Sequence, residues 1–262
     1  MKIVLGLEYS GTQYSGWQRQ KHARSIQQQV EEALSRVADQ KVTVNCAGRT
    51  DTGVHALHQI VHFETNAVRE MRSWVLGANV NLPQDISILW AKPAADDFHA
   101  RFSATGRSYR YIILNRPARP GIYNRRVTWE CRLLDEHKMQ QAADYLIGEH
   151  DFTSYRAVDC QSNSPVRTVR QLVVKRQGDS VLIEIEANAF LHHMVRNIAG
   201  VLMEIGMGKA PVVWSQQVLE ARDRTLGGIT AAPDGLYLTN VTYPEKFKIP
   251  ALAEINPLVI TQ

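Results

Sequence analysis

Hydrophobic patterns typical of strands and of helices alternate along this 262-residue chain, and the same order of strand and helix patterns occurs twice. In the first half, apolar residues at every second position of 2–9 predict a strand, because successive side chains of a strand point to opposite faces. The capping-box pattern Ser25-x-x-Gln28 then predicts the start of a helix. Similar patterns predict the rest of this half: strands at 42–47 and 59–64, a helix near 69–79 and a strand at 85–91.

The second half repeats this order of elements. A strand is expected at 107–114, and Asp135 is expected to cap the helix that follows it. Gly178-Asp179 predicts a hairpin turn, and the strongest helical pattern, at 191–206, ends at glycines. The remaining expected elements are the hairpin strands 167–176 and 180–187, a helix near 214–224 and a closing strand at 236–243.

Each half therefore has the order strand, helix, strand, strand, helix, strand, which is the split β-α-β pattern. This order predicts an α+β protein of two pseudo-symmetric β-α-β-β-α-β halves, with joined sheets and a central cleft between the halves. We expect an N-terminal half at 1–105, a C-terminal half at 106–243 and an extended tail at 244–262.

Composition argues against several classes of protein. No uncharged apolar stretch approaches the roughly 18 residues of a membrane span, and the N-terminus reaches Glu8 before a signal-like apolar block forms. Cys46, Cys131 and Cys160 are far apart and odd in number, so neither a disulfide framework nor a CxxC metal half-site is expected. We therefore expect reduced thiols in a cytoplasmic protein.

The net charge of +4 is modest, but the basic residues are concentrated. Between Asp97 and Glu130 there are seven arginines, several aromatic residues and no acidic residue, and 10–30 is a second acid-free stretch. Arginine and lysine neutralise phosphates, and aromatic faces stack on unpaired bases. The pattern favours binding of a folded RNA with a splayed nucleotide; the alternative is a solvated basic face.

The segment between Cys46 and His55 is the strongest candidate for chemistry. A strand is expected to end near Cys46, after which Gly48 and Gly53 bracket a tight loop that holds Arg49 and Asp51. A nearby guanidinium favours the ionised form of a carboxylate, so Asp51 is expected to act as an acceptor or a nucleophile. The alternative is an aspartate that only shapes the turn.

Residues 48–55, GRTDTGVH, resemble the signature loop of the tRNA pseudouridine synthase A family, although Thr52 stands where alanine is common. The resemblance extends in the family's order from about residue 3 to 243, and only the last twenty or so residues look idiosyncratic. Other segments that carry it are 14–20 (YSGWQRQ), 62–64 (HFE), 97–103 (DFHARFS), 110–111 (RY), 151–154 (DFTS) and 188–197 (NAFLHHMVRN).

The resemblance implies an isomerase that converts uridines at positions 38–40 of the tRNA anticodon stem-loop to pseudouridine. It further implies base flipping into the central cleft, no cofactor, and a homodimer that binds tRNA with both subunits. Asp51 matches the nucleophile, Tyr109 the tyrosine that packs on the uracil, and Arg196 the basic partner of the carboxylate. The positions expected to contact RNA are Arg49, which accompanies base flipping, Arg101, Arg110 and, more weakly, Arg69.

The expected helix at 191–206 carries a polar patch at its start: His192, His193, Arg196 and Asn197. An arginine at a buried edge needs a carboxylate partner, and Asp51 in the other half is a candidate. Neighbouring histidines of a helix point about 100° apart, which is poor geometry for chelating one ion, so no metal site is expected.

Pseudouridine formation breaks N1–C1′ and makes C5–C1′, without net redox change, so the reaction needs no redox cofactor or activated donor. Three routes are open to Asp51: attack on C1′, abstraction of the 2′ proton, or addition to C6. Two other functions remain as alternatives. One is an RNA-binding module without activity; the other is a hydrolase, which would need a second acidic residue near Asp51 where the loop offers arginine.

Overall fold

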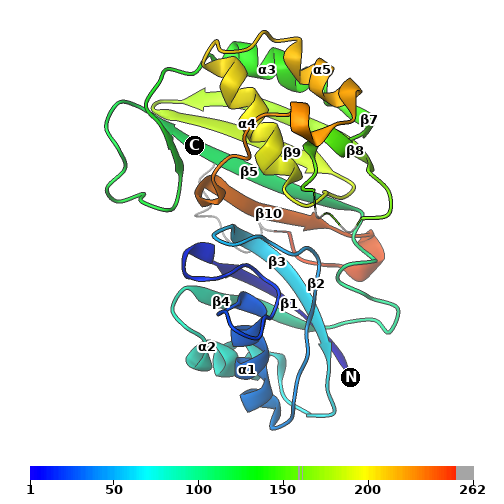
Figure 1. Ribbon diagram of the computed structural model, residues 1–262. Coiled ribbons are helices and arrows are strands. Elements are labelled where there is room, and N and C mark those ends of the chain that lie inside the picture. Colours follow the sequence, from blue (N-terminus) through cyan, green and yellow to red (C-terminus); the bar gives the residue numbers. More distant parts are fainter. Residues whose placement is uncertain (159, 161, 252–262) are drawn as a thin grey trace. The chain divides into compact units, whose positions relative to one another are not determined.

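The computed structural model describes residues 1–158, 160 and 162–251, which form two compact units (Figure 1). The first unit contains Met1–Thr105 together with the segment that begins at Tyr237, and the second contains Gly106–Leu236. Both units combine helices with a sheet, so the predicted α+β class is confirmed. No helix in the described part of the chain is long and apolar enough to cross a membrane.

In the first unit, a sheet of strand order β4-β1-β3-β10 carries two helices, and the short β2 pairs with β3. β1 runs antiparallel to both of its neighbours. The side chain of Ser25 caps the first helix by accepting from the Gln28 backbone N–H at 3.4 Å, as the capping box predicted. The elements are β1 (Lys2–Tyr9), α1 (Ile26–Ala38), β2 (Asn45–Cys46), β3 (His55–Glu64), α2 (Met71–Asn81), β4 (Ile86–Pro93) and β10 (Leu236–Thr242).

The closing strand β10 was expected in the C-terminal half, at 236–243. Instead it pairs in parallel with β3, with Tyr237 opposite His55 and Leu238 opposite Ala56. Periodicity identifies a strand but not the strand it pairs with, so the sequence pattern could not place β10 in the first unit.

The expected C-terminal tail begins after β10. A short 3-10 helix, Glu245–Phe247, packs Phe247 against Phe98, with ring centroids 5.2 Å apart. Lys92 donates to the carbonyl oxygens of Phe247 and Lys248, at 3.1 and 2.7 Å. The start of the tail is therefore attached to the first unit, and the rest of the predicted tail, 252–262, lies outside the described residues.

In the second unit the strand order is β5-β9-β8-β7, and β6 pairs in parallel with β5. The hairpin predicted at Gly178-Asp179 is confirmed, and the Asp135 side chain caps α3 by accepting from the Lys138 N–H at 3.0 Å. The elements are β5 (Gly106–Asn115), β6 (Thr128–Glu130), α3 (Glu136–Asp144), β7 (Gly148–Asp151), β8 (Val166–Gln177), β9 (Ser180–Ala187), α4 (Met194–Gly206) and α5 (Trp214–Ala221).

The helix α4 begins at Met194, three residues later than the apolar pattern predicted. His193 precedes it in the left-handed region, with φ +60°, and Met194 N donates to Leu191 O at 3.1 Å in a turn. The apolar pattern extends through this turn because Leu191 is buried there, although it is not helical. Such a boundary error is expected where a buried turn continues the helical spacing.

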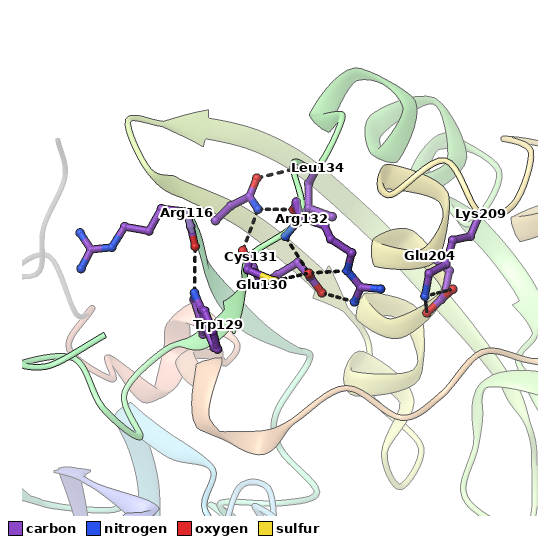
Figure 2. A network of polar contacts seen from close by, with 9 residues as sticks. Arg116, Trp129, Glu130, Cys131, Arg132, Leu134, Glu204 and Lys209 are labelled. Carbon is purple, nitrogen blue, oxygen red and sulfur yellow. Dashed lines mark hydrogen bonds and ion pairs between the residues drawn. The ribbon is translucent and has the colours of Figure 1, made fainter. Parts of the chain in front are cut away.

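The arginine-rich loop 116–127 has a fixed base (Figure 2). The Trp129 indole donates to Arg116 O at 2.9 Å, and the carboxylate of Glu130 accepts from both Nε and Nη2 of Arg132, at 2.7 and 2.8 Å. These bonds to Arg132 lower the pKa of Glu130, although its burial opposes the shift. Asn115 completes the network by donating to the carbonyls of Glu130 and Arg132.

Candidate functional site

The loop that carries Asp51 joins β2 to β3 in the first unit. Its backbone is bonded to the segment before α1: Trp17 N donates to Thr50 O at 2.9 Å, and Gly53 N donates to Tyr14 O at 3.4 Å. Within the loop, Val54 N donates to Asp51 O at 3.1 Å. The loop therefore has a defined conformation that the preceding segment helps to maintain.

Gly16 allows this close approach. Its φ of +84° is unfavourable for other residues, and a Cβ there would lie 2.8 Å from Thr50 O and 3.1 Å from the Asp51 carbonyl carbon. The segment 14–20, which resembles the family, thus packs directly on the backbone of the candidate nucleophile.

Two buried side chains hold the loop from the sheet side. The Gln59 amide on β3 donates to Gly48 O at 2.6 Å and accepts from Gly48 N at 3.4 Å. The Tyr9 hydroxyl on β1 lies 2.8 Å from the Thr50 hydroxyl and accepts from the Gln59 amide at 3.4 Å. Gly48 and Thr50 flank Arg49, so the backbone on both sides of Arg49 is fixed.

The structure brings Arg49 and Arg101 near the same point at the base of this loop. Burial raises the pKa of the Cys46 thiol to about 12, and the charges of Arg49 and Arg101 act in the opposite direction. Arg101 is exposed, and its guanidinium lies 5.5 Å from the Phe102 ring centroid. Two arginines expected to contact RNA therefore lie in the surroundings of the Asp51 loop.

Arg69 is not part of this group in the described structure. It lies exposed before α2, and its polar contact among the described residues is a donation to the neighbouring Val68 O at 3.0 Å.

In the second unit, the strand β5 presents Tyr109 and Arg110 to opposite faces. Tyr109 is 9% exposed and packs edge-on against Phe190, with ring centroids 5.0 Å apart. Arg110 forms an ion pair with Glu184 at 2.6 Å, and Lys175 pairs with the same carboxylate at 3.0 Å. Burial would raise the pKa of Glu184, but hydrogen bonds from these two cations lower it.

Arg196 lies in the first turn of α4. Its Nε donates to Ala231 O at 2.8 Å, and its own carbonyl accepts from Ala231 N at 3.1 Å. Burial raises the pKa of Tyr111 on β5, and the Arg196 charge counters this shift, so Arg196 lies near the strand of Tyr109.

The polar patch predicted at the start of this helix differs in two ways from the observed one. Asn197 is 2% exposed and faces inward, where its amide donates to Tyr155 O at 2.8 Å. His192 and His193 precede the helix, and their rings lie 4.0 Å apart, so the angular argument against joint metal binding does not apply to them.

Gln59, Tyr9 and Ala231 were not identified from the sequence. A glutamine within a predicted buried strand is the one signal that could have pointed to Gln59, because a buried amide requires hydrogen-bond partners. Tyr9 fits the apolar pattern of its strand, and Ala231 acts through its backbone, so neither leaves a trace in the sequence.

Comparison with known proteins gives consistent matches. A family model described as tRNA pseudouridine synthase matches residues 7–103 and 142–244. The tRNA pseudouridine synthase A of Nitrosococcus oceani is 59% identical over 253 residues, which cover 97% of this chain and 98% of that protein. Those of Shewanella halifaxensis and Alcanivorax borkumensis are 54% identical over 258 residues (98% and 98%) and 55% over 250 residues (95% and 94%).

Proposed function

Because the chain belongs to the tRNA pseudouridine synthase family, and is thus an isomerase, we propose that it acts on uridines 38–40 of the tRNA anticodon stem-loop with Asp51 as its nucleophile. The positions and the nucleophile come from the resemblance of the GRTDTGVH loop and of the segments around it. The rival functions, an inactive RNA-binding module and a hydrolase, do not fit this family.

The observation that carries the role of Asp51 is the scaffold of its loop. Gln59, Tyr9 and the backbone of 14–17 hold the loop through bonds that end on Gly48, Thr50 and Gly53. A reacting group must be held within a fraction of an ångström of its productive position, which requires such supporting contacts. The loop thus has the support that a catalytic carboxylate needs.

In the proposed reaction the ionised carboxylate of Asp51 starts the cleavage of N1–C1′ by one of the three routes named above. The uracil stays in the pocket and turns, and C5 bonds to C1′ as Asp51 returns to its starting state. A base removes the C5 proton and N1 gains a proton, so that no atom is gained or lost. Tyr109 provides a flat wall for the uracil and a hydroxyl that can relay a proton. No redox or group-transfer cofactor is required by this balance.

Arg196 is proposed to pair with the Asp51 carboxylate and orient it. Arg49 is proposed to accompany base flipping, which costs a few kcal/mol and is least costly for weakly paired nucleotides. Contacts of Arg101, Arg110 and Arg69 with the RNA backbone are proposed to offset that cost. By the same resemblance, the enzyme is proposed to be a cytoplasmic homodimer that binds tRNA with both subunits.

The test is incubation of the protein with an unmodified tRNA that has uridine at positions 38–40, followed by mapping of pseudouridine. A matched tRNA with cytidine at these positions is the control. Pseudouridine at 38–40 alone is the expected result. Release of uracil would indicate hydrolysis, binding without change would indicate a binding module, and pseudouridine elsewhere would refute the proposed positions. Light scattering of the same preparation tests the dimer.

A further inference from the structure

A segment between α5 and β10, here called the strap (residues 224–232), lies along α4 in the second unit (Figure 1). Three consecutive strap residues bind this unit, two of them at α4 and the third at β5. The Thr230 hydroxyl donates to Asn197 Oδ1 at 2.7 Å, Ala231 forms both of its bonds with Arg196, and Ala232 O accepts from the Tyr111 hydroxyl at 2.8 Å.

A glycine on α4 allows close contact between this helix and the strap. A Cβ on Gly200 would overlap the carbonyl oxygen of Ile229, so only a glycine permits the strap backbone to lie on α4 at this point. One turn earlier on the same helix lie Arg196 and Asn197, the residues that the strap binds.

Asn197 and Arg224 anchor the strap. Nη2 of Arg224 donates to Asn197 Oδ1 and to the Thr230 hydroxyl, both at 3.1 Å. Just before the strap, Asp223 N donates to the buried Ser154 hydroxyl at 2.8 Å. Since Asn197 also donates to Tyr155 O, the strap is connected to the core of the unit at several points.

The strap links α4, which carries Arg196, to β5, which carries Tyr109; the proposed function gives roles to both residues. Tyr111 is two residues from Tyr109 on β5, so both side chains lie on the same face of that strand. At the other end, the bond from Arg196 Nε to Ala231 O restricts the rotation of the guanidinium about its long axis.

We propose that the strap is a positioning element, which holds the guanidinium of Arg196 in a set orientation relative to Tyr109, and that Thr230 and Tyr111 are its positioning residues. This inference rests on the proposed roles of Arg196 and Tyr109. Neither positioning residue needs to touch the uridine; each acts through the backbone of Ala231 and Ala232.

The test uses Thr230→Val and Tyr111→Phe in the full-length enzyme. Each removes one hydroxyl that holds the strap, and displacement of a catalytic group by about 1 Å can cost on the order of 100-fold in rate. We expect kcat on tRNA to fall by about 10-fold to 100-fold, with KM unchanged within about twofold, and Thr230→Ser to restore most of the rate. Thr225→Val is the matched control, because its hydroxyl bonds only to Asp223 Oδ1 within the described structure.

Combining each strap variant with Arg196→Lys distinguishes a loss of Arg196 positioning from a general loss of structure. Lysine lacks the Nε–H that binds Ala231 O, so in single-turnover assays the strap variants should cost little further rate in this background. Two outcomes would overturn the strap proposal alone. One is an equal loss of rate from the strap variants in the wild-type and Arg196→Lys backgrounds. The other is wild-type kcat in both strap variants while Arg196→Met is inactive. Wild-type turnover of Arg196→Met would instead remove the proposed role of Arg196, and the strap proposal with it.

Discussion

Asp51 is the residue on which the proposed mechanism depends, and it can be tested without disturbing its loop. Asp51→Asn keeps the size of the side chain but removes its charge and its nucleophilicity. We expect this variant to fold, to bind tRNA at least as well as the wild type, and to form no detectable pseudouridine. Thermal unfolding, tRNA affinity and product should be measured on one preparation. Turnover within tenfold of the wild type, a barrier change of only about 1.4 kcal/mol, would exclude Asp51 as the nucleophile.

Tyr9 on β1 supports the same loop through its hydroxyl. Its hydroxyl lies 2.8 Å from the Thr50 hydroxyl, one residue before Asp51. Tyr9→Phe should lower kcat, because the loop loses a contact, and should reduce the free energy of unfolding by about 1 kcal/mol. Tyr145→Phe, at an exposed position of the other unit, is the control for loss of a tyrosine hydroxyl. Unchanged kcat in Tyr9→Phe would show that Gln59 and the backbone bonds are sufficient to hold the loop.

At the level of elements, Arg110 on the strand β5 and Arg101 in the segment before it differ in their surroundings. Arg110 already has the Glu184 carboxylate as a partner, whereas Arg101 is exposed beside Phe102. Arg101→Gln is therefore expected to reduce the log–log salt slope of tRNA binding by about 0.7 to 0.9, the effect of one phosphate contact. Arg110→Gln should reduce it less. Titrations of affinity over a range of salt concentrations measure both, and equal reductions would mean that Arg110 leaves Glu184 to bind RNA.

At the scale of the whole molecule, two buried histidines of β3 make stability depend on pH. The pKa of both His58 and His62 is lowered to about 4, chiefly by burial, and at His62 the nearby His99 and Lys2 contribute to the same shift. An unfolded histidine titrates near about 6.5, so the unfolded chain binds more protons between these values. The free energy of unfolding should therefore fall as pH falls below about 6.5, by up to about 1.4 kcal/mol per pH unit for each histidine.

Chemical denaturation at pH 7, 6 and 5 measures this dependence. His62→Asn is expected to reduce the slope, because it removes one of the two protons taken up on unfolding. Equal stability of the wild type at pH 7 and pH 5 would contradict the burial of neutral histidines. A slope that remains unchanged in His62→Asn would assign the pH dependence to other groups.

Local patterns in the sequence predicted most elements and the family, because periodicity, caps and contiguous motifs depend on neighbouring residues. The cap at Ser25, the cap at Asp135 and the hairpin at Gly178 are confirmed. The expected strand at 42–47 is only the pair Asn45–Cys46, since pairing with β3 in the structure extends over those two residues. Local propensity did not limit that strand; the position of its partner did.

The sequence by itself determined the class of fold, the family and the identity of the candidate nucleophile, all of which are encoded in short segments. Only the tertiary structure decided which strand β10 pairs with, that Gln59 holds Gly48, and that Ala231 and Ala232 connect Arg196 to Tyr111. Such hydrogen bonds join backbone groups and side chains that are distant in the chain. A backbone carbonyl is the same in every residue type, so the sequence carries no sign of which one a distant side chain will bind.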